Sequence, residues 1–449
     1  MTFHVRNARL PCHDEIRRES KGRVHEDPLA KTGSQRLDQL TTLSSEYSAP
    51  PPVAFVTSRR SVSDNIRRTA HLCTHCVISR WLLLLLAANM IALAGCDGRP
   101  AATVATADST KNATGEVARG TDPDGAQGAG AYDSVAHSRM FRSADDTATV
   151  RLNPGRSRHD EISYSAAIRA GRKAVANWPA APAVLSGAIL PQYRIVAYYG
   201  NPHSKKMGVL GEYPEQEMLS MLDNTAALWR QADPSTPVIP AIHLVAVVAQ
   251  GYAGPDGQWR LREGPDTIEQ AYRRAQSRQG LLFLDVQAGH STLQQELPLL
   301  LRYLERPDVH LGIDPEFYMH YKREGIRPSV KVGQMMSTDV NYVIQVLDQL
   351  AREKNLPPKI LVVHRFRADM VPDAENIRPT PRVQVVMHMD GWGPPWLKFD
   401  SYKDYIVRHP VAFTGFKFFY HNDTKSGEPM LTELEVLQLL PRPLYLQYQ

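Results

Sequence analysis

Residues 281–316 read LLFLDVQAGHSTLQQELPLLLRYLERPDVHLGIDPE. The stretch opens with an apolar run at 281–286, continues through a segment with apolar residues at helical spacing at 292–305, and ends in a second apolar run at 309–313. Short runs that are almost wholly apolar are typical of strands covered on both faces, and such strands form parallel sheets joined by crossover helices. The stretch therefore predicts one strand-helix-strand unit of an α/β fold.

The same pattern recurs throughout residues 191–449. Predicted strands cover residues 193–199, 239–248, 281–286, 309–313, 360–363, 383–387 and 411–419, and predicted helices cover 214–230, 266–278, 292–305, 337–352 and 431–440. Such a series fits a (β/α)8 barrel of the TIM type better than an open doubly wound sheet, because Gly200-Asn201-Pro202 after the first strand is a turn and not a glycine-rich phosphate loop.

The pattern does not identify the eighth strand of this barrel. Three alternatives stay open: the strand is degenerate, it lies before Tyr193, or it is formed by residues 444–448. Because a closed barrel of this type needs eight parallel strands, an incomplete barrel is the remaining alternative.

An apolar run at residues 81–95 follows Arg80 and leads into Leu93-Ala94-Gly95-Cys96, which resembles the lipobox of a bacterial lipoprotein. The resemblance implies a signal peptide over residues 77–95 and a lipid on Cys96, and hence a membrane-anchored, extracytoplasmic protein of a bacterial cell. A transmembrane or core helix is the alternative, but the run is shorter than the about twenty residues that span a bilayer. Residues 1–76 are predicted to be either absent from the working protein, with a start at Val77, or a disordered extension.

The segments between this signal and the barrel differ in composition. Residues 96–150 contain few large apolar side chains, which predicts a low-complexity tether, and residues 151–190 form a lead-in with a predicted helix at 163–175. The chain has four cysteines, none after Cys96, so the domain is expected to fold without disulfides. The net charge of +5 depends partly on the basic residues before the signal, and no nucleic-acid partner is predicted.

Polar side chains end nearly every predicted strand. They include Tyr198, Asp285, Gln287, Asp314, Glu316, His364, His388, Asp390, Lys417 and Tyr420. In a (β/α)8 barrel the carboxyl ends of all strands meet on one face, which carries the catalytic residues. These side chains therefore predict a cleft there, although strand ends are also polar simply because loops begin at them.

Alternation along a strand places Asp314 and Glu316 on the same side. A carboxyl group beside a carboxylate has a raised pKa, which suits a general acid near neutral pH. We therefore expect Glu316 to be the catalytic acid, Asp314 to orient or tune it, and Asp390 to be the second catalytic carboxylate, with Asp285 also available. The alternative is that one of the pair caps a turn or forms an ion pair with Arg365.

The motif Gly312-Ile313-Asp314-Pro315-Glu316 resembles the acidic fourth-strand motif of chitinase-like and lysozyme-like barrels. The resemblance implies a glycoside hydrolase that acts on cell-envelope or extracellular polysaccharide without a cofactor. The longer string of alternating acids found in chitinases is absent, which counts against substrate-assisted cleavage of N-acetyl sugars. The whole domain also resembles uncharacterised bacterial barrel lipoproteins, and this resemblance implies no activity.

Aromatic side chains near the predicted cleft suit a sugar, because its apolar ring faces stack on flat side chains. We expect Trp392 and Trp396 to be such platforms, with Tyr199, Phe317 and Tyr318 as further aromatic candidates. We expect glycan contacts from Tyr198, Asp285, Gln287, His364, His388, Lys417 and Tyr420.

Two other hypotheses stay open. One is a metal-dependent hydrolase built on His364, His388, Asp390, Asp314 and Glu316, although no helical His-Glu-x-x-His motif supports it, and no metal is predicted. The other is a non-catalytic glycan-binding or scaffold lipoprotein, which an ion pair from Glu316 to Arg365 or Lys417 would favour.

Overall fold

The computed structural model of the 449-residue chain describes residues 140–141, 152–179, 182–321 and 326–449. The predictions for residues 1–76, the signal segment 77–95 and the lipid site Cys96 lie outside the described residues, as does the tether 96–150 apart from Met140 and Phe141. Within the described ranges, no helix is long and apolar enough to cross a membrane.

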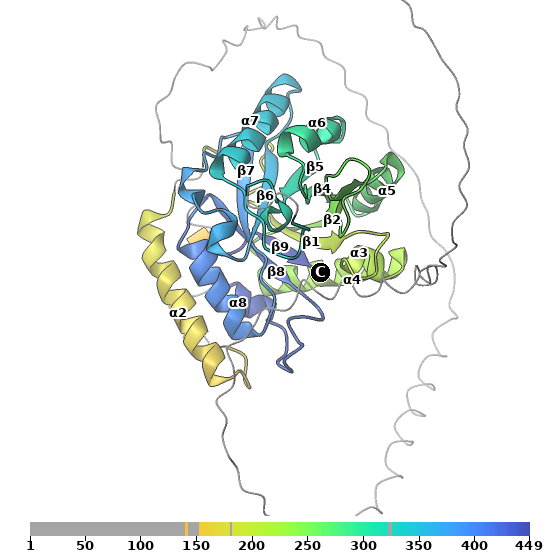
Figure 1. Ribbon diagram of the computed structural model, residues 1–449. Coiled ribbons are helices and arrows are strands. Elements are labelled where there is room, and N and C mark those ends of the chain that lie inside the picture. Colours follow the sequence, from red (N-terminus) through yellow and green to blue (C-terminus); the bar gives the residue numbers. More distant parts are fainter. Residues whose placement is uncertain (1–139, 142–151, 180–181, 322–325) are drawn as a thin grey trace, which may run out of the picture. The chain divides into compact units, whose positions relative to one another are not determined.

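Eight parallel strands form a closed barrel (Figure 1). They are β1 (Arg194–Gly200), β2 (Val238–Ala249), β4 (Leu281–Val286), β5 (Val309–Ile313), β6 (Lys359–Arg365), β7 (Val383–Met389), β8 (Phe413–Phe418) and β9 (Tyr445–Tyr448). Each pairs with the next in chain order, and β9 closes the ring by pairing with both β8 and β1. The predicted TIM-type α/β barrel is therefore confirmed, the eighth strand is the last of the three alternatives, and the incomplete barrel is wrong.

Helices surround the barrel (Figure 1). They are α2 (Arg158–Ala174), α3 (Val209–Glu212), α4 (Glu215–Ala232), α5 (Pro265–Gln276), α6 (Leu293–Leu304), α7 (Ser337–Glu353), α8 (Pro395–Ser401) and α9 (Glu433–Val436). Further helical turns lie at Val175–Asn177, Pro315–Phe317, Ala368–Met370, Ala374–Asn376 and Tyr402–Val407. A three-residue strand, β3 (Arg260–Arg262), pairs antiparallel with the end of β2 and takes no part in the barrel ring.

Alternation along each strand divides the core into two layers. Inward-facing residues fill the lower barrel with a compact cluster that includes Ala197, Phe283, Val362 and Phe413. Their neighbours along the strands face outward and pack beneath the helices. Further toward the carboxyl ends of the strands, the same inward positions carry acids, histidines and a lysine, so the polar site lies directly above an apolar plug.

The lead-in segment packs against the barrel unit. Helix α2 starts at a capping box between Ser157 and Asp160, earlier than the predicted start, and lies along α8 (Figure 1). Arg156 forms a buried ion pair with Glu435 at 2.7 Å, just before α2. Gly171 of α2 contacts the backbone of Leu440 so closely that an added Cβ would lie 2.2 Å from the Leu440 carbonyl oxygen. Helix α2 and the residue Arg156 before it are thus fixed to the C-terminal part of the barrel.

Candidate functional site

Asp285 lies at the centre of the polar layer inside the barrel. It follows the apolar part of β4, and its side chain is fully buried. One carboxylate oxygen, Oδ2, accepts a hydrogen bond from the Tyr199 hydroxyl at 3.1 Å. The other, Oδ1, faces Nε2 of His243 at 3.6 Å and Nε2 of His364 at 3.7 Å. The cluster thus joins side chains from β1, β2, β4 and β6.

Asp390 follows β7 and is held by two cationic groups. Its Oδ2 bonds to Nδ1 of His364 at 2.7 Å, and its Oδ1 lies 2.8 Å from Nζ of Lys417. Burial alone would raise the pKa of Asp390, but the charges of Lys417 and His364 outweigh it and hold this pKa well below its usual range. Burial lowers the pKa of His364, but Asp285 and Asp390 outweigh this effect and raise it. Asp390 is therefore ionised.

Asp314 and Glu316 have the opposite electrostatic character. Oδ1 of Asp314 accepts a hydrogen bond from the Glu316 backbone N–H at 3.0 Å, and Oδ2 accepts one from the Gln287 amide at 3.3 Å. Burial, together with the charges of Asp285 and Asp390, raises the pKa of Asp314 to about 7. Removal of the Glu316 carboxyl from water, with the charges of Asp314 and Asp390, raises the pKa of Glu316 well above its usual value. Asp314 and Glu316 therefore keep a proton between them, beside the ionised Asp390.

The geometry of this acidic pair differs from the strand alternation that predicted it. Strand β5 ends at Ile313, and Asp314 caps the helical turn Pro315–Phe317, so the turn sets the position of Glu316. Asp314 is buried, whereas Glu316 is only half-buried. Within the described part of the chain, Glu316 forms no ion pair with Arg365 or Lys417. Arg365 donates instead to backbone carbonyls of the loop after β6.

His243 was not among the predicted site residues, and Tyr199 was predicted only as a further aromatic candidate for the cleft. His243 lies in the middle of β2, and its Nδ1 contacts the Tyr445 hydroxyl at 2.5 Å and the Gln447 amide at 3.0 Å. The Tyr199 hydroxyl bonds to Asp285, and Nζ of Lys417 lies over the Tyr199 ring, 4.0 Å from the ring centre. Side chains alternate along a strand, so every second residue faces the barrel interior. His243 lies two residues after the interior residue Ala241 of β2, and this spacing would have identified it.

His388 lies inside the barrel, next to this cluster. Its ring packs edge-on at 5.1 Å from the rings of both His364 and Tyr445. Burial and the neighbouring His364 hold the pKa of His388 well below its usual value, so its imidazole is neutral.

The structure places three of the predicted glycan-binding aromatics, Tyr198, Tyr420 and Trp396, away from the cluster around Asp285 and Asp390. Tyr198 faces outward, where its hydroxyl bonds to Thr225 of α4 at 2.8 Å and to the Tyr420 hydroxyl at 2.8 Å. Trp396 belongs to α8 and stacks on His159 of α2, with ring centroids 4.2 Å apart. Trp392 is half-buried in the loop after β7, two residues beyond Asp390. Of the two tryptophans, Trp392 is the one that lies close in sequence to an acid of the cluster.

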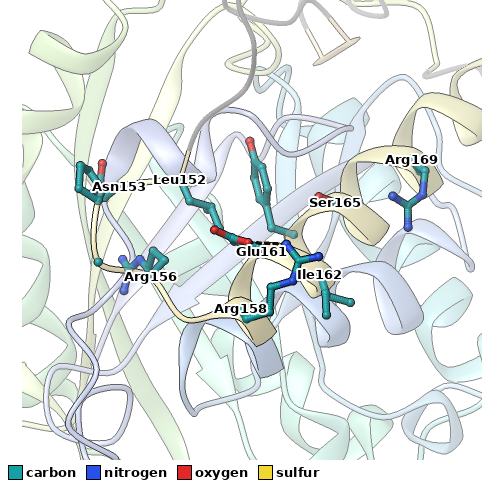
Figure 2. Close-up of a pocket in the computed structure, with 11 residues that line it drawn as sticks. Leu152, Asn153, Arg156, Arg158, Glu161, Ile162, Ser165 and Arg169 are labelled. Atoms are coloured by element: carbon teal, nitrogen blue, oxygen red, sulfur yellow. Dashed lines mark hydrogen bonds and ion pairs between the residues drawn. The ribbon is translucent and has the colours of Figure 1, made fainter.

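A separate hollow of about 590 Å³ lies at the start of α2 (Figure 2). Its lining includes Asn153, Arg156, Glu161 and Arg169, and none of the predicted site residues. Arg156 is already paired with Glu435, and Arg158 is paired with Glu161 at 2.8 Å. The charges of this hollow are therefore largely balanced within the protein.

Comparison of the chain with models of known protein families finds no match, and comparison with curated proteins finds none either.

Proposed function

We propose that this protein is a glycoside-hydrolase-like enzyme that cleaves cell-envelope or extracellular polysaccharide by carboxylate acid-base chemistry. The observation that carries the proposal is the opposite perturbation of neighbouring carboxyl groups. The pKa of Glu316 is raised and that of Asp390 is lowered, within one cluster at the carboxyl ends of the barrel strands. Neighbouring carboxyls whose pKa values are pushed apart are the arrangement that divides acid and base roles in glycosidases.

The surroundings of each group support its role. Glu316 is half-buried and has no ion pair to Arg365 or Lys417, so its proton remains available to a glycosidic oxygen. Asp390, held by His364 and Lys417, is the carboxylate that would act as nucleophile or base. Asp314 has a carboxylate oxygen within 4.8 Å of one in Asp390, and it orients the turn that carries Glu316. Trp392, half-buried and two residues after Asp390, is the aromatic side chain that would supply a flat apolar surface for the sugar.

The proposal includes the location predicted from the Leu93-Ala94-Gly95-Cys96 motif, namely a lipid anchor on Cys96 and an extracytoplasmic barrel at the bacterial membrane. In cells, Cys96→Ala is expected to release the protein from the membrane fraction. The intact mass of the membrane-extracted parent is expected to match acylation of Cys96. A parent protein of unmodified mass would contradict the anchor without affecting the enzymatic proposal.

Activity is tested by glycan release from envelope and exopolysaccharide preparations. The parent, Glu316→Gln and the exposed control Glu217→Gln are compared at equal thermal stability. A general acid typically contributes about 10²- to 10⁴-fold, so Glu316→Gln is expected to lose at least about 100-fold in release while the control is unchanged. Glycan retained by both parent and Glu316→Gln without release would favour the non-catalytic binding protein. Release that Glu316→Gln leaves unchanged would refute the assignment of the acid.

A further inference from the structure

Three buried polar atoms converge inside the barrel without a hydrogen-bond partner among the described residues. They are Nε2 of His243, Oδ1 of Asp285 and Nε2 of His364, and all three side chains are fully buried. An unsatisfied buried polar group typically costs about 1–3 kcal/mol. Three such atoms aimed at one point indicate a missing shared partner.

The spacing of these atoms identifies the kind of partner. Oδ1 of Asp285 lies 3.6 Å from Nε2 of His243 and 3.7 Å from Nε2 of His364, and all three atoms lie within 4.8 Å of one another. These distances are too long for hydrogen bonds. Ligand atoms bound tetrahedrally to zinc at about 2.1 Å are about 3.4 Å apart, which is close to the observed values. We propose that His243, Asp285 and His364 bind a divalent transition-metal ion, with Zn²⁺ the best fit to two imidazoles and one carboxylate.

The other polar atom of each proposed ligand is already bonded to a neighbouring side chain. In metal sites such outer contacts hold the ligands in the orientation that binds the ion. Nδ1 of His364 bonds to Asp390, and Oδ2 of Asp285 accepts the Tyr199 hydroxyl. Nδ1 of His243 contacts the Tyr445 hydroxyl at 2.5 Å. These contacts fix each side chain so that its free atom faces the other two.

Gly312 leaves the space in front of two of the three ligands, Asp285 and His243, open. A Cβ added to Gly312 would lie 2.5 Å from Oδ1 of Asp285 and 2.6 Å from Nε2 of His243. A methyl group at this position would therefore displace both ligand atoms without removing either. The glycine thus provides a variant that alters the proposed site and keeps its ligands.

A second set of potential ligands, Asp314, His364 and Asp390, is less suited to a metal ion. Oδ2 of Asp390 is already bonded to Nδ1 of His364 and its Oδ1 already meets Lys417, and Asp314 accepts hydrogen bonds on both oxygens. A proton on His364 would leave Nε2 of His243 unpaired. An ion between His243, Asp285 and His364 satisfies all three orphaned atoms at once.

The inference rests on ligands other than Glu316 and Asp390, so it stands or falls independently of the proposed activity. It is tested on the full chain purified from zinc-supplemented cells. Because the sequence Cys73-Thr74-His75-Cys76 offers zinc ligands of its own, every variant also carries Cys73→Ser and Cys76→Ser. Elemental analysis is expected to find one zinc ion per chain. Removal of the zinc by chelator is expected to lower Tm, and added ZnCl2 is expected to restore it.

His243→Gln and Asp285→Asn are expected to lose the bound zinc and the Tm response, and Gly312→Ala is expected to weaken both. The control His310→Gln, which removes another fully buried barrel histidine, is expected to keep them. Tyr445→Phe removes an outer contact and is expected to weaken zinc affinity about 10- to 100-fold.

Should the ligand variants fail to fold, Co²⁺ added to the metal-free parent is expected to give the visible absorption bands of a tetrahedral site. A parent without zinc whose Tm and Co²⁺ spectrum do not respond would overturn the inference. Zinc retained by both folded ligand variants would also overturn it.

Discussion

Replacement of Lys417 by methionine is expected to destabilise the barrel strongly. Nζ of Lys417 lies 2.8 Å from Oδ1 of Asp390, and the two side chains are only 3% and 7% exposed. Removing one partner of a buried ion pair leaves an uncompensated charge and costs about 3–5 kcal/mol. Because domains are stable by only about 5–15 kcal/mol, Lys417→Met is expected to lose a large fraction of the total free energy of unfolding.

Urea unfolding, followed by circular dichroism in the presence of a chelator, measures this loss. Adding Asp390→Asn to Lys417→Met is expected to recover much of the stability, because the buried carboxylate that lost Lys417 and kept only His364 is then gone. Lys205→Met, at an exposed lysine, is the matched control and is expected to change stability by less than about 0.5 kcal/mol. A double variant no more stable than Lys417→Met alone would refute the reasoning that burial makes this pair important.

Two further predictions concern other buried ion pairs. Burial raises the pKa of Asp233, but its hydrogen bonds and the charge of Arg194 outweigh burial and lower this pKa to about 2. Asp233 therefore contributes about 2 kcal/mol to stability above its unfolded pKa near 4, and this contribution is lost as pH falls through 2. In Asp233→Asn, the free energy of unfolding is expected to change less between pH 4 and pH 2 than in the parent. An unchanged slope would contradict this. Arg156→Ala removes the ion-pair partner of buried Glu435 and is expected to speed hydrogen exchange in α2. The exposed control Arg158→Ala is expected to leave the exchange rate unchanged. Equal protection of α2 in both variants would show that this pair does not hold α2.

The central strands of the barrel were predictable because burial on both faces leaves an uninterrupted apolar run. The boundaries of β4 and β5 match the predicted ranges 281–286 and 309–313. The eighth strand was harder to predict, because Tyr445, Gln447 and Tyr448 place hydroxyl and amide groups within a four-residue strand. Helix α2 starts five residues before its predicted range, at a cap formed by polar residues that carry no apolar period.

Strand parity explains which site residues were predicted and which were missed. Tyr198 and Tyr199 both end β1, but only Tyr199 shares the inward face of Ala197, and residue type alone does not distinguish them. His243 was missed because it lies within a long apolar strand rather than at its end. The placement of Trp396 against His159 depends on how α2 packs, and no pattern local to either residue indicates this contact.

Closure of the barrel by β9 affects how the chain folds. Strand β1 pairs with a strand that begins at Tyr445, nearly the full length of the barrel domain away. Contacts of such long sequence separation form slowly, and until they form both β1 and β8 expose unpaired edges. A polypeptide that has not yet delivered residues 445–448 therefore cannot seal its barrel. Under the proposed extracytoplasmic location, this dependence on the last strand would keep the chain unfolded during export and delay closure until the whole domain has crossed the membrane.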